Sequence, residues 1–580
     1  MAIPPAAPAA VGGVPDQTFG SGGVASISAS VPEARESGRA MVVDSQDRVL
    51  VGGGVLAKEP TEPNGGWVLA RFLSDGSPDP TFGQGGVSKD APGLFGPGLA
   101  EFGQEIGALA IEPGTGRIIA GGMTVNPAHR SLFTIARYNT DGRLDTSFGP
   151  ADTGFVTAEF TSSGADLEDM AVGPDGSITA VGQSGLDAAV GRWDSDGNPD
   201  PAFDGPGGTG NGLFTDHIAG TFDDLRDVDV EPSGAVRAVG VASSASEALW
   251  LVVRYTPTGA RDGEFHGDGA VTIGFGNGGD IGGGQVLDGN TLYVFGSLDT
   301  EPGAKTERDF AVTALDATTG TRIAGTTARL DLPGTQNLFA AGLQRVGGAG
   351  DPAAERFVMV GTGKTPVGEG GGALLAAMRR VGGSSSALEV DPEFGSGGLV
   401  LPPQQDGIWT DVATDSRNRI LVGGELGVFE TADLSAARYV GLATLGAADT
   451  TAPVITNARI SPRAWAVKPR GRAEAPVASR AKRGTSFLYT LSEPARVTIR
   501  IERQKRKGKR AKRFVRAGAF AAAAIAGPNR RRFSGRIGKR RLKPGRYRAT
   551  LIATDAAGNA SQPRRLRFRI LPAAGGRAGL

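Results

Sequence analysis

A pattern that recurs about every sixty residues constrains the fold of this chain more than any other feature. Seven times, a run of alternating hydrophobic residues ends in a hydrophobic residue followed by glycine, at Gly52, Gly121, Gly182, Gly240, Gly296, Gly361 and Gly423. Successive glycines are 69, 61, 58, 56, 65 and 62 residues apart. This spacing is too regular for chance and too long for one rung of a solenoid. The chain of 580 residues is therefore a repeat protein over most of its length.

Each repeat contains the signals of four short strands. Residues 170–181 alternate on both sides of a Pro-Asp-Gly turn, which predicts a β-hairpin that ends at the glycine landmark. A third strand ends in arginine followed by an aromatic residue, at Arg71, Arg137, Arg192, Arg254 and Arg438. We expect this arginine to stack on a neighbouring aromatic ring or to pair with the aspartate of the adjacent turn, as a packing device common to the repeats. An Asp-Gly turn, a phenylalanine and a glycine-led strand then follow, as at Asp75, Phe82 and Gly85. Four strands per repeat are typical of a propeller blade.

The phase of the repeat predicts how the ring closes. The chain begins with the signature of a fourth strand at residues 19–24, and the last repeat ends after its third strand at residues 437–440. If the first strand completes the last blade, no sheet edge remains open. The expected fold is all-β: a seven-bladed β-propeller closed by the N-terminal strand, with a further domain after it.

One stretch carries a family resemblance. Residues 137–149 read Arg-Tyr-Asn-Thr-Asp-Gly-Arg-Leu-Asp-Thr-Ser-Phe-Gly, which resembles the bacterial delta-60 repeat family. The resemblance covers residues 14–440 and is weakest in the fifth and sixth repeats, and the order of landmarks is also similar to the NHL propeller repeat. It implies a repeat propeller in large, usually exported proteins. The family has no agreed catalytic residues, so the resemblance assigns none here.

Charge divides the chain into two domains. Residues 1–450 hold 27 Lys and Arg against 57 Asp and Glu, whereas residues 451–580 hold 34 against 4. We therefore expect a disordered Ala/Pro-rich N-terminus (1–13), the propeller (14–445), a linker (446–454), a basic domain (455–572) and a disordered tail (573–580). Residues 1–13 lack the basic and apolar regions of a signal peptide, and no apolar stretch is long enough for a transmembrane helix. A cytoplasmic protein and an exported one with an upstream signal both remain open.

The basic domain has the strand pattern of a small sandwich. Residues 487–491, 495–501 and 545–555 alternate, and residues 565–570 alternate strictly between arginine and a hydrophobic residue. Several strands within about 120 residues suggest an immunoglobulin-like β-sandwich. Residues 547–559 look like the closing hairpin of bacterial Ig-like and fibronectin-III-like modules.

A dense run of cations lies between two predicted strands of this domain. Eight of the eleven residues 503–513 are basic: Arg503, Lys505, Arg506, Lys507, Lys509, Arg510, Lys512 and Arg513. A polyanion would bind there with steep salt dependence, because its counterions would be released. The alternative is a solvated hairpin tip. No helix-turn-helix or zinc pattern accompanies the run, so we expect no sequence-specific nucleic-acid binding.

Metal and catalytic signals are weak. The chain has no Cys and only three His, at positions 129, 217 and 266, so we expect no zinc site. The pairs Asp141 with Asp145 and Asp196 with Asp200 could face Ca²⁺, but an Asx-type turn explains their spacing without metal. No Gly-x-Ser-x-Gly elbow between a strand and a helix and no His-Glu-x-x-His motif occurs. We expect no catalytic residue, metal or cofactor.

The repeat breaks mainly in loops that should share one mouth of the channel. These are residues 54–66, 297–307 and 362–372 after second strands, and 89–104 between two repeats. Ligand sites concentrate on such loops, which makes this face the expected binding surface.

The function that we expect is non-enzymatic. The chain would be an extracellular or cell-surface binding or scaffold protein, with a ligand at the propeller loop face. The basic domain would hold it on an anionic cell-envelope polymer or on another protein. The alternative is a carboxylate-based hydrolase or lyase at the channel mouth, which needs at least two non-repeating Asp or Glu side chains with raised pKa values.

Overall fold

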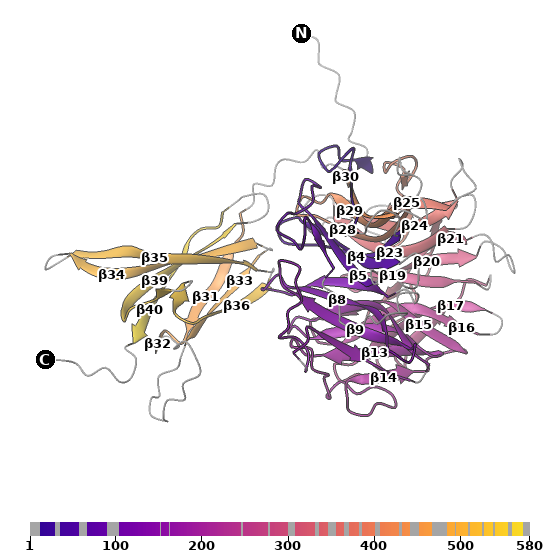
Figure 1. Ribbon diagram of the computed structural model, residues 1–580, viewed down its shortest axis with the longest axis horizontal. Coiled ribbons are helices and arrows are strands. Elements are labelled where there is room, and N and C mark those ends of the chain that lie inside the picture. The colour runs from indigo at the N-terminus through magenta and orange to yellow at the C-terminus, as the bar shows by residue number, and fades with distance from the viewer. Residues whose placement is uncertain are drawn as a thin grey trace, which may run out of the picture. The chain divides into compact units, whose positions relative to one another are not determined.

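The chain forms two compact units, Met1–Gly446 and Ala447–Leu580, in the computed structural model (Figure 1). The structure describes residues 12–29, 35–56, 66–89, 104–150, 152–161, 163–244, 247–276, 279–299, 308–330, 336–345, 355–364, 371–381, 386–400, 407–427, 432–440, 452–466, 484–492, 495–507, 511–524, 527–537, 540–554 and 560–571. The expected disordered tail and nearly all of the expected N-terminal disordered segment lie outside these ranges. Within them, no helix is long and apolar enough to cross a membrane.

The described residues of the first unit form seven antiparallel sheets, six of them from consecutive strands. The first four sheets are β3–β6 (Arg35–Val43, Val49–Leu56, Gly66–Phe72, Val87–Ser88), β7–β10 (Glu105–Ile111, Ile118–Val125, Ser131–Tyr138, Phe155–Ala158), β11–β14 (Ala165–Val172, Ile178–Ser184, Asp187–Trp193, Leu213–Asp216) and β15–β18 (Phe222–Val230, Val236–Ser243, Ala248–Tyr255, Ala270–Ile273). The next two are β19–β22 (Ile281–Asp288, Thr291–Asp299, Arg308–Asp316, Ala328–Leu330) and β23–β27 (Gln336–Arg345, Glu355–Lys364, Gly371–Arg380, Leu388–Val390, Leu399–Val400). The last joins β28–β30 (Gly407–Thr414, Ile420–Leu426, Asp433–Val440) to β1 (Val14–Pro15) and β2 (Val24–Ile27).

The first strand of each sheet is the inner strand, and these strands form a circuit. In chain order β3, β7, β11, β15, β19, β23 and β28 each contact the next, and β28 contacts β3. The N-terminal segment completes the last sheet: Val24 pairs with Ala437 in β30, and Val14 pairs with Val440. The segment from 14 to 27 and the segment from 433 to 440 therefore lie side by side although the whole first unit separates them in sequence.

A β-bulge in every inner strand explains the recurring glycine. In the third sheet the register shifts between Leu167 and Asp169, which leaves Glu168 as the extra residue. The facing residue is Gly182, and a Cβ there would lie 2.0 Å from the carbonyl oxygen of Asp166. Only glycine fits such a close backbone approach. In three repeats two glycines are adjacent, and the one that faces the bulge is the second, at Gly53, Gly122 and Gly424. The glycines predicted from the sequence in these repeats, Gly52, Gly121 and Gly423, therefore lie one residue before the equivalent position.

The repeated arginine is a packing device that joins neighbouring sheets. Arg137 pairs with Asp145 at 2.9 Å, lies over the ring of Phe148 and donates to the carbonyl oxygen of Ser195 in the next sheet at 2.6 Å. The same arginine–aspartate–phenylalanine set recurs at Arg71, Asp79 and Phe82, at Arg192, Asp200 and Phe203, and at Arg438, Asp16 and Phe19. In this last set the N-terminal segment supplies the aspartate and the phenylalanine. Stacking on an aromatic ring and pairing with the turn aspartate, both expected from the sequence, occur together.

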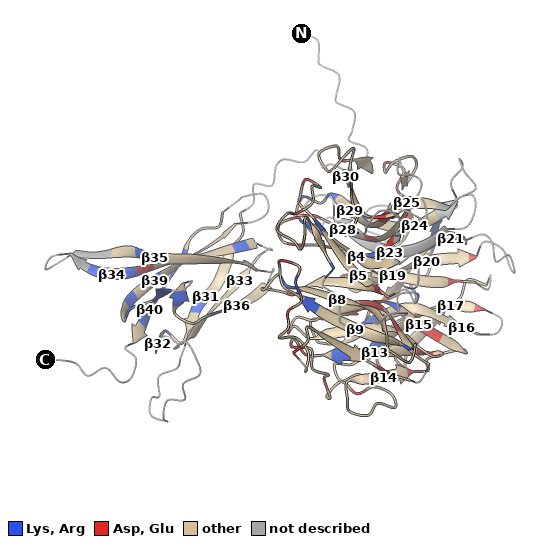
Figure 2. Cartoon of the chain, in the orientation of Figure 1, with Lys and Arg blue, Asp and Glu red and all other residues tan. Residues whose placement is uncertain are grey.

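The second unit has two main sheets around one hydrophobic core. One sheet is β31 (Ile455–Ser461), β33 (Thr485–Leu491) and β36 (Gly527–Phe533). The other follows the order β32 (Ala464–Ala466), β40 (Arg564–Leu571), β39 (Gly545–Thr554), β34 (Ala495–Lys507) and β35 (Ala511–Ala524), and a short ribbon pairs β37 (Arg536–Ile537) with β38 (Arg540–Arg541). Phe487 and Phe533 from the first sheet and Ile499, Leu551 and Phe568 from the second belong to the same buried cluster. Arginines recur along β39 and β40 of the second sheet, where the strands are partly blue in Figure 2.

Candidate functional site

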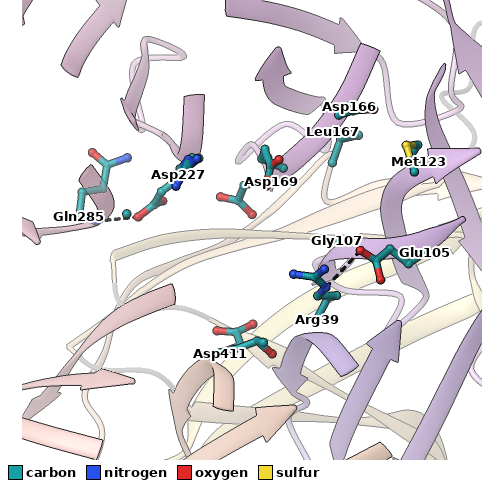
Figure 3. Close-up of a pocket in the computed structure, with 14 residues that line it drawn as sticks. Arg39, Glu105, Gly107, Met123, Asp166, Leu167, Asp169, Asp227, Gln285 and Asp411 are labelled. Carbon is teal, nitrogen blue, oxygen red and sulfur yellow. Dashed lines mark hydrogen bonds and ion pairs between the residues drawn. The ribbon is translucent and has the colours of Figure 1, made fainter. Parts of the chain in front are cut away.

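The residues that bulge from the inner strands break the repeat. At the seven equivalent positions the chain has Arg39, Gly107, Glu168, Arg226, Gly283, Phe339 and Thr410. Six of these seven residues line one cavity of about 600 Å³, into which inner strands of several sheets contribute side chains (Figure 3). Three of these residues, Arg39, Glu168 and Arg226, are charged. A charge that only some sheets carry cannot have the same structural role in every sheet, so these residues mark the candidate site.

Three aspartates follow a bulge and surround the cavity from different strands. Asp169, Asp227 and Asp411 occupy the same position of β11, β15 and β28, and Figure 3 shows their carboxylates turned toward the cavity. Each accepts a backbone N–H of the next inner strand: Asp169 from Val228 at 2.8 Å, Asp227 from Gln285 at 2.6 Å and Asp411 from Met41 at 2.8 Å. These carboxylates therefore connect neighbouring sheets. We name them the aspartate ring.

Burial disfavours the charged form of the aspartate ring. It raises the pKa of Asp411 to about 6 and that of Asp227 to about 7, and it holds the pKa of Asp169 well above the usual value of an aspartate. The negative charge of Asp227 adds to the effect on Asp169. The ring has no cation paired with it among the described residues.

The mouth of the cavity carries charges of both signs. Arg39 pairs with Glu105 at 3.1 Å, and Arg226 pairs with Asp224 at 2.8 Å, so a carboxylate holds each arginine in place. Glu168 lines the cavity, and its side chain is open to solvent there although the surrounding protein atoms partly desolvate its carboxyl group. Burial and the nearby charge of Asp224 raise the pKa of Glu168 to about 7. Six carboxyl groups and two arginines line the cavity. Four of the six carboxyl groups have raised pKa values, so the charge of the cavity changes with pH near neutrality.

Antiparallel pairing places the expected loops at the same end as this mouth. Glu105 at the start of β7 pairs with Met123 near the end of β8, so second-strand loops and the loops that enter inner strands share that end of the sheets. Most of residues 54–66, 89–104, 297–307 and 362–372 lies outside the described residues. The sequence pointed to this end, but it did not identify the side chains of the inner strands.

The turn aspartates act as Asx-type acceptors. Asp145 Oδ1 accepts the backbone N–H of Ser147 at 3.2 Å, and Asp200 Oδ1 accepts that of Ala202 at 3.1 Å. Asp145 also pairs with Arg137. These contacts use the oxygens that Ca²⁺ would need.

One group of three possible metal ligands went unnoticed in the sequence. Ligand atoms of Asp187, His217 and Asp223 lie within 4.8 Å of one another. His217 Nδ1 lies 2.9 Å from Asp187 Oδ1, and Asp223 Oδ2 accepts the backbone N–H of Ile218 at 2.8 Å. Asp187 and His217 thus already bond to each other, and Asp223 bonds to the backbone.

The cation run of the second unit forms a hairpin. Lys505 pairs with Arg513 and Arg506 with Lys512 in the backbone register of β34 and β35, so basic residues occupy opposite positions of the two strands. Arg503 Nη2 donates to the carbonyl oxygen of Pro544 at 2.8 Å. The residues Lys509 and Arg510, and the side chains of Arg506, Lys507, Lys512 and Arg513, lie outside the described part of the chain.

Comparison with known proteins supports the propeller. Residues 47–82 and 114–148 match the family described as "Domain of unknown function (DUF5122) beta-propeller". Each match runs from a hairpin turn through the arginine to the phenylalanine of the packing set. The protein is therefore all-β and contains a β-propeller.

Solved structures with a similar chain path differ strongly in sequence. Sqt1 from Chaetomium thermophilum is 13% identical with a TM-score of 0.37, over 70% of this chain and 96% of that one. Virginiamycin B lyase from Staphylococcus aureus is 10% identical with a TM-score of 0.37, over 71% and 98%. An exo-β-1,3-galactanase from Clostridium thermocellum is 10% identical with a TM-score of 0.27, over 81% and 93%. No curated protein sequence matches the chain.

Proposed function

We propose that this chain is a non-enzymatic binding protein, exported or displayed at the cell surface, with two binding surfaces. The mouth of the propeller channel takes a ligand, and the basic second unit attaches the protein to an anionic polymer. The opposite charge of the two parts supports two separate binding functions, because residues 1–450 contain 57 acidic residues and the remainder contains 34 basic residues. An anionic cell envelope would suit the basic unit.

The same proposal includes the finer architecture. The seven sheets would be seven blades of a delta-60-like propeller that the N-terminal strand closes, and the second unit would be an immunoglobulin-like sandwich. The pairing of Val24 with Ala437 and the contact of β28 with β3 support the closed ring. The single buried cluster that both sheets of the second unit share supports the sandwich.

The ligand of the channel mouth would present a cationic group. The observation that carries this proposal is the cavity rich in carboxyl groups, in which Glu168 and the aspartate ring have raised pKa values and form no ion pair with a cation of the described residues. A bound ammonium or guanidinium group would stabilise the ionised carboxylates and release their protons. The arginines at the mouth would repel such a ligand, but Arg39 is paired with Glu105 and Arg226 with Asp224, and these carboxylates offset the charge of the arginines.

Titration calorimetry with spermidine as the probe tests this site. At pH 7 in buffers of different ionisation enthalpy, we expect binding to release protons, because the cation lowers the pKa of Glu168. Glu168→Gln should weaken binding at least fivefold and reduce the proton release, whereas Glu264→Gln, at an exposed turn, should change neither. Equal binding by wild type and Glu168→Gln would contradict the proposal.

Attachment by the second unit is tested on the full chain. Immobilised anionic polymer should retain the protein at low salt and release it as NaCl increases, because each phosphate contact releases counterions. Retention that does not depend on salt, or no retention, would contradict this part of the proposal.

A carboxylate-based hydrolase or lyase is the second candidate, and the raised pKa of Glu168 favours it, since a general acid needs a pKa near neutrality. Against it, each aspartate of the ring accepts a backbone N–H group of the next inner strand and so has a structural contact, which among the described residues leaves Glu168 as the cavity-lining carboxyl group with a raised pKa and no such contact. Turnover of a chromogenic glycoside panel that Glu168→Gln abolishes would establish this candidate instead.

A further inference from the structure

The outward face of the second unit's larger sheet is an arginine array. Alternation along the strands buries Ile499, Ala549 and Phe568 and turns the neighbouring arginines outward. We name as the arginine face Arg500 of β34, Arg546 and Arg548 of β39, and Arg565, Arg567 and Arg569 of β40. All of these are exposed except Arg548, which is half-buried.

The register places like charges directly opposite one another. Arg546 pairs with Arg569, and Arg548 pairs with Arg567. Opposed like charges destabilise a sheet, so folding alone does not explain this arrangement. Glu502, the described acid that contacts this face, pairs with Arg548 at 2.7 Å. The other five arginines have no acidic partner among the described residues.

The geometry suits an anion that repeats along a line. Alternate residues of a strand are about 7 Å apart, so Arg565, Arg567 and Arg569 form a row with that spacing beside Arg546 and Arg548. Guanidinium groups bind phosphate through two hydrogen bonds, which the ammonium of lysine cannot do. Successive phosphodiesters of an extended polyol phosphate, separated by six bonds, can meet such a row one after another.

Other polyanions fit the face less well. Proteins that bind single-stranded nucleic acid stack bases on exposed aromatic rings, but the described aromatic ring beside this face, Phe514, lies under the guanidinium of Arg548 at 4.3 Å. A flat sheet face does not enter a groove of duplex DNA. Binding to a membrane surface would require exposed apolar side chains among the arginines. In the described strand β40 every exposed side chain is an arginine, and the apolar side chains are buried or half-buried.

We infer that the arginine face binds a linear polyol phosphate polymer, such as poly(glycerol phosphate). This inference rests on the proposed attachment function and assigns it to the sheet face instead of the hairpin end at residues 503–513. The hairpin end would then be an accessory contact.

The test measures binding of lipid-free poly(glycerol phosphate) by the full chain over a range of NaCl concentrations. The face variant is Arg546→Gln with Arg567→Gln and Arg569→Gln. It should bind at least tenfold more weakly, and the slope of log K against log salt should fall by about 2, since each lost phosphate contact on a flexible chain removes about 0.7. The hairpin variant, Lys505→Gln with Lys507→Gln and Lys512→Gln, removes the same charge and should bind within about twofold of wild type. Glu502→Gln should bind a few-fold more tightly, and unchanged melting temperatures show that the variants fold.

The outcomes separate the two levels of the proposal. If wild type binds no polyanion at low salt, the attachment function itself is wrong. If wild type binds but the hairpin variant loses affinity and the face variant does not, only the assignment to the arginine face is overturned. Preference for single-stranded DNA, polyglutamate or anionic vesicles over poly(glycerol phosphate) would overturn the choice of ligand.

Discussion

At the scale of single residues, the same repeat position serves packing in some sheets and carries charge in others. The residue after the bulge is Ala40 or Ala108 in two inner strands and aspartate in three. Each of these aspartates takes a backbone N–H from the next strand, so the ring gains contacts between sheets at the cost of burying a carboxylate. The free energy of unfolding should therefore depend on pH in the range where these groups titrate.

Asp411 gives the clearest pH prediction. Its folded-state pKa of about 6 exceeds the ordinary value of 3.8, so the folded state binds the proton more tightly than the unfolded chain does. Its contribution to stability is complete below about pH 4 and is lost as pH rises through 6. Between about pH 5 and pH 8 the ionisation of Asp411 should lower the free energy of unfolding of the wild type by on the order of 1–3 kcal/mol. Asp411→Asn should not show this decrease, because asparagine stays neutral and can still accept the N–H of Met41.

Urea unfolding at both pH values measures this effect. Asp152→Asn, at an exposed turn, controls for the loss of one negative charge. The same pH dependence in wild type and Asp411→Asn would show that Asp411 does not titrate as described.

Arg137→Lys tests the packing set at the same scale. Lysine keeps the charge but cannot reach Asp145 and the carbonyl oxygen of Ser195 together while stacking on Phe148. We expect the free energy of unfolding to fall by about 1–3 kcal/mol, measured by urea denaturation. Arg143→Lys, at an exposed turn, should be neutral, and equal losses at the two positions would contradict the role of the set.

The sequence predicts the arginine set but not the aspartate ring, for a physical reason. Three markers of the set recur together in most repeats, so their contact could be expected. Asp169, Asp227 and Asp411 occur in only three repeats, and each looks like the polar start of an alternating strand. Their common signal in the sequence is a distance of 13 residues to the equivalent glycines, Gly182, Gly240 and Gly424. This signal can be recognised only when the position of the bulge is known, because the bulge shows which glycine is the equivalent one.

At the scale of strands and hairpins, the bulge connects the recurring glycine with the candidate site. The extra residue of the inner strand lines the channel, and the facing glycine leaves space for the carbonyl group of the residue two positions before that extra residue, which is Asp166 in the third sheet. Alternation and turn residues predict the hairpins well, because both strands show them. A one-residue bulge leaves almost no trace in a period of two, so the sequence could not indicate which side chain enters the channel.

Gly182→Ala tests this connection. The added Cβ would lie 2.0 Å from the carbonyl oxygen of Asp166, so the bulge or the strand pairing must shift. We expect a loss of about 1–3 kcal/mol in the free energy of unfolding together with a weaker response to spermidine. Gly263→Ala, where the nearest atom to a new Cβ is 3.7 Å away, should be close to neutral. A neutral Gly182→Ala would refute the explanation of the glycine.

At the scale of the whole first unit, the account depends on closure by the N-terminal segment. Asp16 and Phe19 complete the packing set of Arg438, whose guanidinium also donates to the carbonyl oxygen of Ser74 in the first sheet. Without this segment the last sheet would lose its outer strands, and the link from β30 to the first sheet would weaken. The sequence predicts the closure because the repeat starts and stops out of phase.

Disulfide trapping tests that closure most directly, and the absence of native cysteine makes it unambiguous. Ser26 and Ser435 face each other across β2 and β30, with their hydroxyl oxygens 2.8 Å apart. Ser26→Cys with Ser435→Cys should form an intramolecular disulfide on mild oxidation, seen as a reducible shift in gel mobility, whereas Ser26→Cys with Ser297→Cys should not. Failure of the first pair to cross-link, or equal cross-linking of both pairs, would contradict the closed ring and the channel that depends on it.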